Sequence, residues 1–155
     1  MAQAAKKPGG EDVAADQRTV TVRGAGAGKY AQVIDVDYHR LLSDEGPATG
    51  GDDAGPNPHE IALGGLGACT AMTLRMYADL KKIALQDVIV SLSYERVDGK
   101  GPDGKPAKID RVRREIEIVG ELDAAQRQRM LEIAERCPVH RMMTGYATFE
   151  TRLKE

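Results

Sequence analysis

An uncharged stretch in the middle of the chain constrains the fold more than any other feature. Residues 61–74 carry no charged side chain, and apolar or small residues continue at helical spacing to about Lys81. The stretch is too short to span a membrane, and Arg75 ends it. A helix without a polar face must be buried on all sides. The pattern therefore predicts a central, fully buried helix.

Three glycines in this stretch predict that another backbone comes close to the helix. Gly64, Gly65 and Gly67 would each cost about 1 kcal/mol relative to alanine in an exposed helix. A single chain of 155 residues cannot easily surround one helix with its own layers. We therefore expect a homodimer with this helix at its centre.

The segments around the helix predict an α+β fold. Apolar and polar residues alternate in four strand-like segments, 18–24, 30–42, 85–98 and 109–122, and in a fifth at the end of the chain, 146–153. The segment 30–42 is expected to bend near Asp35, so that the first two segments form a meander of about three strands. Glycine- and proline-rich segments, 43–58 and 99–108, are expected to be loops.

Capping residues predict where the helices begin. Asn57 can cap the central helix, Pro58 suits its first position, and Glu60 suits the positive end of the helix dipole. Asp123 is expected to cap a second helix, 124–136, which Pro138 ends. The predicted core face of this second helix comprises Met130, Leu131, Ile133 and Ala134.

Composition and the N-terminus exclude several classes of protein. Residues 1–16 have no apolar segment typical of a secretory signal, and we expect them to be a disordered lead before one domain, 17–155. A cytoplasmic protein without membrane association is the resulting expectation. The net charge of −2, with five Tyr, one Phe and no Trp, argues against nucleic-acid binding, which needs a basic surface and stacking platforms.

One of the two cysteines, Cys137, lies among cationic neighbours. If Pro138 opens a new helical turn, Cys137 is its N-cap, where the positive helix end lowers a thiol pKa. Arg136, His140 and Arg141 add positive charge nearby. These features predict an increased thiolate fraction at neutral pH.

The other cysteine, Cys69, lies in the uncharged helix, where a buried thiol is normally inert. The 68 positions between Cys69 and Cys137 exclude a C-x-x-C redox motif. The two cysteines and three histidines also lack the spacing of a metal site, so we expect no metal. Both thiols could instead be small buried core residues.

Two motifs taken together resemble the OsmC/Ohr family of osmotically inducible and organic hydroperoxide resistance proteins. They are "GPNPHEIALGGLGACTAMTLRMYADLKK" and "ERCPVHRMM", and the resemblance covers residues 18–154. It implies an intertwined homodimer with antiparallel sheets wrapped around two central helices. It also implies a thiol-dependent peroxidase that uses no metal, haem or flavin.

The resemblance assigns a role to each thiol. Cys69 matches the cysteine that attacks a hydroperoxide and becomes a sulfenic acid, and Cys137 matches the cysteine that resolves it to a disulfide. A dithiol reductant, dihydrolipoyl-type in the best-known members, would restore both. This assignment differs from the local argument, which makes Cys137 the more reactive thiol.

The chain departs from the family pattern at the residues that activate the attacking thiol. The family's glutamate position holds His59 here, and the glutamate comes one residue later, at Glu60, which is either a catalytic candidate or only the partner of the helix dipole. Arg40 is the candidate for the activating arginine, with His39 beside it as a substrate-binding candidate. Strand alternation puts Arg40 and His39 on opposite faces, so only one can point inward.

A non-catalytic alternative follows from these departures. In that alternative, a pocket at the dimer interface binds a small apolar or thiol-bearing ligand, with His59 and His140 providing polar recognition. The displaced glutamate favours this alternative, and the pair of cysteines favours the peroxidase.

Overall fold

The computed structural model describes residues 18–145 and 147–154. It has the predicted α+β composition, and the chain divides after Ile61 into two compact units. The predicted disordered lead, residues 1–16, lies outside the described residues. Among the helices described, none is long and apolar enough to cross a membrane.

The first unit contains the predicted three-stranded meander. Its strands are β1 (Val20–Gly24), β2 (Gln32–Val36) and β3 (His39–Ser43), which pair antiparallel in the order β1-β2-β3. The predicted bent segment 30–42 is in fact two strands, because a tight turn places Val36 opposite His39. Asp37 in this turn has φ +59°, a left-handed conformation that aspartate adopts more readily than most residues.

A long loop follows β3 and is organised by a buried carboxylate. Asp44 is 2% exposed and accepts hydrogen bonds from the backbone N–H groups of Glu45, Asp52 and Ala54. Burial alone would raise the pKa of Asp44, but these three N–H groups outweigh it and lower that pKa. The loop therefore depends on one ionised side chain.

Helix α1 (Pro58–Lys81) begins where the capping residues predict. Asn57 Oδ1 accepts the Glu60 N–H at 3.0 Å, and Glu60 Oε2 accepts the Asn57 N–H at 2.8 Å, so the two residues form a reciprocal capping box.

Only one face of α1 is buried within a single chain. The buried residues recur at helical spacing, namely Leu66, Gly67, Thr70, Leu74 and Ala78. A second face exposes Met72, Met76 and Leu80, whose exposed fractions are 60%, 70% and 77%. The structure confirms the predicted helix, but one chain alone does not bury it on all sides.

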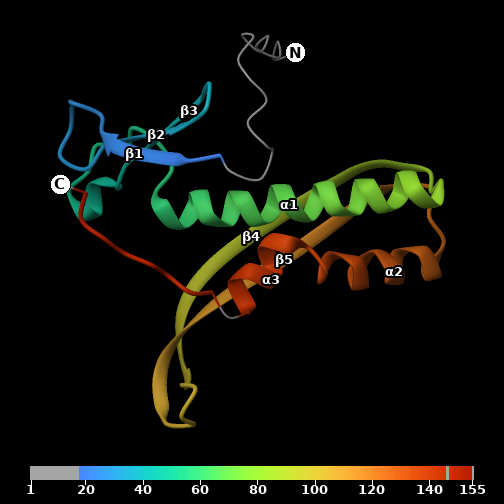
Figure 1. Ribbon diagram of the computed structural model, residues 1–155. Helices are drawn as coiled ribbons and strands as arrows, with labels where there is room; N and C mark the ends of the chain where they lie inside the picture. Colours follow the sequence, from blue (N-terminus) through green and yellow to red (C-terminus); the bar gives the residue numbers. More distant parts are fainter. Residues whose placement is uncertain (1–17, 146, 155) are drawn as a thin grey trace. The chain divides into compact units, whose positions relative to one another are not determined.

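Strands β4 (Leu85–Lys100) and β5 (Pro106–Gly120) form one long antiparallel hairpin (Figure 1). The predicted loop 99–108 was too long, because pairing continues until Lys100 lies opposite Pro106. An ion pair between Lys108 and Asp98, at 2.7 Å, supports this end of the hairpin.

Helices α2 (Ala124–Ala134) and α3 (Pro138–Thr144) follow the hairpin, and α2 starts with the predicted Asp123 cap. The core of the second unit joins α1, β4 and α2 through Leu74, Ala78, Val88, Met130, Ile133 and Ala134. The prediction for Leu131 was wrong, since this side chain is 47% exposed. It follows Met130 by one residue, about 100° around the helix, and so lies off the buried stripe.

The predicted strand 146–153 is absent from the described part of that segment. Residues 147–154 pair with neither sheet, and Phe149 and Leu153 are 89% and 95% exposed. Alternation alone does not make a strand, because its backbone groups also need a partner edge.

Candidate functional site

The two thiols, 68 positions apart in sequence, lie within hydrogen-bonding reach of each other. Cys69 comes from the buried side of α1 and is partly exposed, whereas Cys137 is the N-cap of α3 and is 0% exposed. Both are free thiols. Of the candidates named from sequence, the structure thus brings Cys69 and Cys137 together, with His140 on the first turn after Cys137.

The surroundings of the pair favour ionisation of Cys137 over ionisation of Cys69. Burial opposes ionisation of Cys137, but hydrogen bonds from the Cys69 thiol, the His140 N–H and the Thr70 hydroxyl lower its pKa. Burial raises the pKa of Cys69, and the hydrogen bond with Cys137 raises it further. Of the two thiols, Cys137 is therefore the one that loses its proton more readily, and the Cys69 thiol is placed to donate a hydrogen bond to the Cys137 thiolate when it forms.

The low pKa of Cys137 agrees in direction with the sequence argument, but its principal causes differ. The N–H groups of the α3 first turn contribute, as expected for an N-cap. The other main contributions come from the Cys69 thiol and the Thr70 hydroxyl, whereas Arg136 and Arg141 are exposed. Hydrogen bonds rather than neighbouring arginines stabilise this thiolate.

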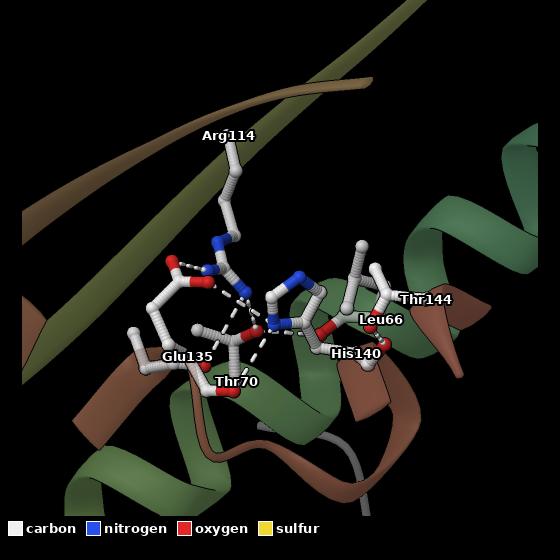
Figure 2. A network of polar contacts seen from close by, with 7 residues as sticks. Leu66, Thr70, Arg114, Glu135, His140 and Thr144 are labelled. Atoms are coloured by element: carbon white, nitrogen blue, oxygen red, sulfur yellow. Dashed lines mark hydrogen bonds and ion pairs between the residues drawn. The ribbon is translucent and has the colours of Figure 1, made fainter. Parts of the chain in front are cut away.

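Figure 2 shows a polar network that sequence reasoning missed, and two of its members, Thr70 and His140, contribute to the lowered pKa of Cys137. Arg114 of β5 donates from Nη1 to Thr70 Oγ1 at 3.2 Å and from Nη2 to Glu135 Oε1 at 2.6 Å. Its side chain is only 12% exposed. The sequence contained one indication of this inward position. Arg114 is two residues before Ile116 and four before Ile118, and every second residue of a strand lies on the same face.

His140 joins the same network through Glu135. Its Nδ1 lies 3.2 Å from Glu135 Oε2 and 3.1 Å from the Glu135 backbone oxygen (Figure 2). The side chain of His140, a substrate-binding candidate, is thus held at the C-terminal end of α2. The backbone N–H of His140 is among the groups that lower the pKa of Cys137.

Arg40 and His39 belong to the first unit and have their own contacts there. Arg40 is 66% exposed and pairs with Asp35, with Nε 2.6 Å from Oδ1, and Arg23 pairs with the same carboxylate at 3.3 Å. The His39 ring lies against the Tyr38 ring, with 4.2 Å between centroids. An activating role for Arg40 would require it to exchange or share Asp35.

Glu60 and His59 lie in the first turn of α1 and are exposed. The Glu60 carboxylate is engaged by the Asn57 N–H in the capping box. Its observed role is therefore to cap the helix, and His59 precedes it on the same turn.

Comparison with known families places most of the chain in one of them. Residues 50–152 match the model of the family described as OsmC-like protein. The search of curated proteins found no match.

Solved structures share the fold at low sequence identity. An OsmC-like protein from Mycoplasma pneumoniae has a TM-score of 0.68 and 19% identity, over 84% of this chain and 89% of its own. An organic hydroperoxide resistance protein OsmC from Legionella pneumophila has a TM-score of 0.60 and 22% identity, over 86% and 93% of the two chains. An organic hydroperoxide resistance protein from Elizabethkingia anophelis gives 0.57 and 18%, over 84% and 91%.

Proposed function

The chain belongs to the OsmC-like protein family, and we propose that it is a thiol-dependent peroxidase that reduces organic hydroperoxides with Cys69 and Cys137. The observation that carries the proposal is the adjacency of the two thiols, one accessible and one fully buried. The names of several structural neighbours, which are organic hydroperoxide resistance proteins, support the choice of substrate.

The exposure of the two thiols supports Cys69 as the residue that reacts first. A hydroperoxide from solvent can reach the partly exposed Cys69, whereas Cys137 has no exposed surface. The proton of Cys69 passes along its hydrogen bond to the Cys137 thiolate, so that Cys137 acts as the base. With this transfer, Cys69 can be the attacking thiol of the family even though Cys137 ionises more readily.

The chemical steps then balance with two electrons from the protein. The Cys69 thiolate attacks the terminal peroxide oxygen, the O–O bond breaks, and the alkoxide takes the proton from the Cys137 thiol and leaves as an alcohol, so that Cys137 is again a thiolate. The Cys137 thiolate attacks the sulfur of the Cys69 sulfenic acid, the S–O bond breaks as the disulfide forms, and the hydroxide takes up a proton from solvent and leaves as water. A dithiol of the dihydrolipoyl type then reduces the disulfide and becomes a disulfide itself. We place this cycle in the cytoplasm, where thiols are kept reduced.

The active form that we propose is a homodimer. Met72, Met76 and Leu80 recur every four residues and present an apolar face that one chain leaves exposed. A second copy covering this face would give α1 the burial that its uncharged sequence predicts. Light scattering of the purified protein tests this, and a stable monomer would contradict it.

Intact mass spectrometry after one equivalent of an organic hydroperoxide tests the peroxidase. The expected result is a loss of two hydrogens that maps to a Cys69–Cys137 peptide. A Cys137→Ser variant should form a sulfenic acid at Cys69 that persists and that dimedone traps, but more slowly than the wild type because the base is lost, and Cys69→Ser should abolish turnover.

The alternative, a non-catalytic protein that binds a small ligand, is favoured by one observation. The Glu60 carboxylate already caps α1, which leaves the family's activating glutamate without a direct equivalent. Both thiols remaining reduced after the hydroperoxide equivalent would support this alternative and reject the peroxidase.

A further inference from the structure

Among the described residues, Thr70 provides the hydroxyl that lowers the pKa of Cys137, and the one proton of this hydroxyl has two possible acceptors. Thr70 and Cys137 are both 0% exposed, so water does not compete for either group. The Thr70 hydroxyl donates to the Leu66 backbone oxygen at 2.8 Å, and it also lies within hydrogen-bonding reach of the Cys137 sulfur. The orientation of this hydroxyl therefore affects the charge of the sulfur.

Arg114 fixes the acceptor side of the same hydroxyl. A guanidinium has only donors, so its contact of 3.2 Å with Thr70 Oγ1 occupies an oxygen lone pair. The hydroxyl proton must then point away from Arg114. Two acceptors then remain for the Thr70 proton. We expect it to be donated to the Leu66 oxygen when Cys137 is a thiol, and to the Cys137 sulfur when Cys137 is a thiolate.

Arg114 also ties the surrounding elements together. Its Nη1 lies 3.4 Å from the Ala134 backbone oxygen, which also accepts the Cys137 N–H at 3.3 Å. Glu135 holds Nη2 at 2.6 Å on the other side (Figure 2). One guanidinium thus links α1 to the junction of α2 and α3, where Cys137 lies.

The charged and titratable groups around Cys137 indicate orientation rather than bulk positive charge as the main effect. Cys69 faces it from α1, Arg114 lies behind Thr70 from β5, and His140 follows on α3. Glu135 pairs with both Arg114 and His140, so its carboxylate offsets the positive charge of the guanidinium. What Arg114 contributes is a fixed donor to Thr70.

We propose that Arg114 and Thr70 are positioning residues that hold one hydroxyl donor for the thiolate of Cys137. Arg114 donates to Thr70 Oγ1, and Thr70 donates its proton to Cys137 Sγ when that sulfur is ionised. The catalytic meaning of this relay rests on the proposed function, because Cys137 is there both the base for Cys69 and the resolving thiol.

The test measures ionisation directly rather than turnover. With ¹³C at the cysteine β carbon, the chain gives two resonances that can be followed against pH, and Cys69→Ser assigns them. Thr70→Val keeps the β-branched shape but removes the hydroxyl, and should lower the thiolate-to-thiol ratio of Cys137 about tenfold at a fixed pH, as expected for one hydrogen bond to a charged group. Arg114→Gln should lower it in the same direction, whereas Thr70→Ser should stay within about twofold of the wild type.

Thr144→Val is the matched control, because Thr144 donates only to the His140 backbone oxygen, at 2.9 Å, and is exposed. It should leave the Cys137 titration unchanged. A folded Thr70→Val protein whose Cys137 titrates like the wild type would overturn the proposal. If that variant does not fold, the wild type still decides. The Thr70 methyl resonance should titrate with the midpoint of Cys137, and a flat methyl resonance would also overturn the proposal.

The same experiment separates this inference from the peroxidase. Hydroperoxide turnover by the wild-type protein tests the function alone. A protein without turnover in which Thr70→Val still shifts the Cys137 titration would reject the function and keep the relay. A protein with turnover in which Thr70→Val leaves the Cys137 titration unchanged would keep the function and reject the relay.

Discussion

Leu74→Ala should be among the most destabilising single substitutions in the second unit. Leu74 is 0% exposed and packs in the cluster that joins α1, β4 and α2, where Met130 is also 0% exposed. Replacing a fully buried leucine by alanine removes transfer free energy and leaves a cavity, which together cost about 3–5 kcal/mol. That is a large fraction of a typical stability of about 5–15 kcal/mol.

Urea unfolding followed by circular dichroism measures this cost. With an m-value of about 2 kcal/mol/M, the midpoint should fall by about 1.5–2.5 M. All proteins are compared at one concentration, because the stability of the proposed dimer would depend on it. The matched control is Leu131→Ala, the same chemical change on a side chain that is 47% exposed. It should cost only about 1 kcal/mol, or about 0.5 M in midpoint.

The difference between these two leucines tests the packing of α1 and α2 directly. Sequence reasoning placed Leu131 in the core, whereas the structure excludes it from the buried stripe of α2. Equal midpoint shifts for the two variants, or a shift below about 0.3 M for Leu74→Ala, would refute the packing described here.

Three further predictions concern caps, pH and assembly. Asp123→Ala removes the side chain that accepts the Gln126 N–H at 2.7 Å and should cost about 1 kcal/mol in thermal unfolding, whereas equal stability would argue against the cap. Because the pKa of Asp44 is lowered in the folded chain, its contribution to stability is present above the unfolded pKa and lost as the pH falls through the folded value. Proteolysis of the loop 43–57 should therefore increase on acidification, and in Asp44→Asn it should be fast already at neutral pH; a pH-independent cleavage rate would contradict this. Met76→Lys places a charge on the exposed apolar face of α1 and should halve the mass measured by light scattering, so an unchanged dimer would place the interface elsewhere.

Local chemistry in the sequence predicted well where the helices begin. The caps Asn57 and Asp123 mark the starts of α1 and α2, because a side-chain acceptor for free N–H groups is a short-range requirement. The turn after Cys137 was predicted in the same way, from Pro138 at the first position of α3. Alternation predicted the strands of both sheets, which need only a period of two.

The site could be predicted only in part, because its contacts are long-range. The adjacency of Cys69 and Cys137 followed from a family resemblance and not from spacing. Arg114 and Thr70 are 44 positions apart, and no local pattern connects them. The segment 147–154 shows the opposite error, in which a strand pattern was present but no partner edge lies beside it in the described chain.

Because Cys69 lies in α1 and Cys137 at the start of α3, oxidation of the two thiols would crosslink two separate parts of the fold. A disulfide between Cys69 and Cys137 would close a loop of about 70 residues. The loss of chain entropy in the unfolded state would then stabilise the folded protein by about 4 kcal/mol. The oxidised protein should therefore melt at a clearly higher temperature than the reduced one. The melting temperature of a sample would then report whether the two thiols are reduced or oxidised.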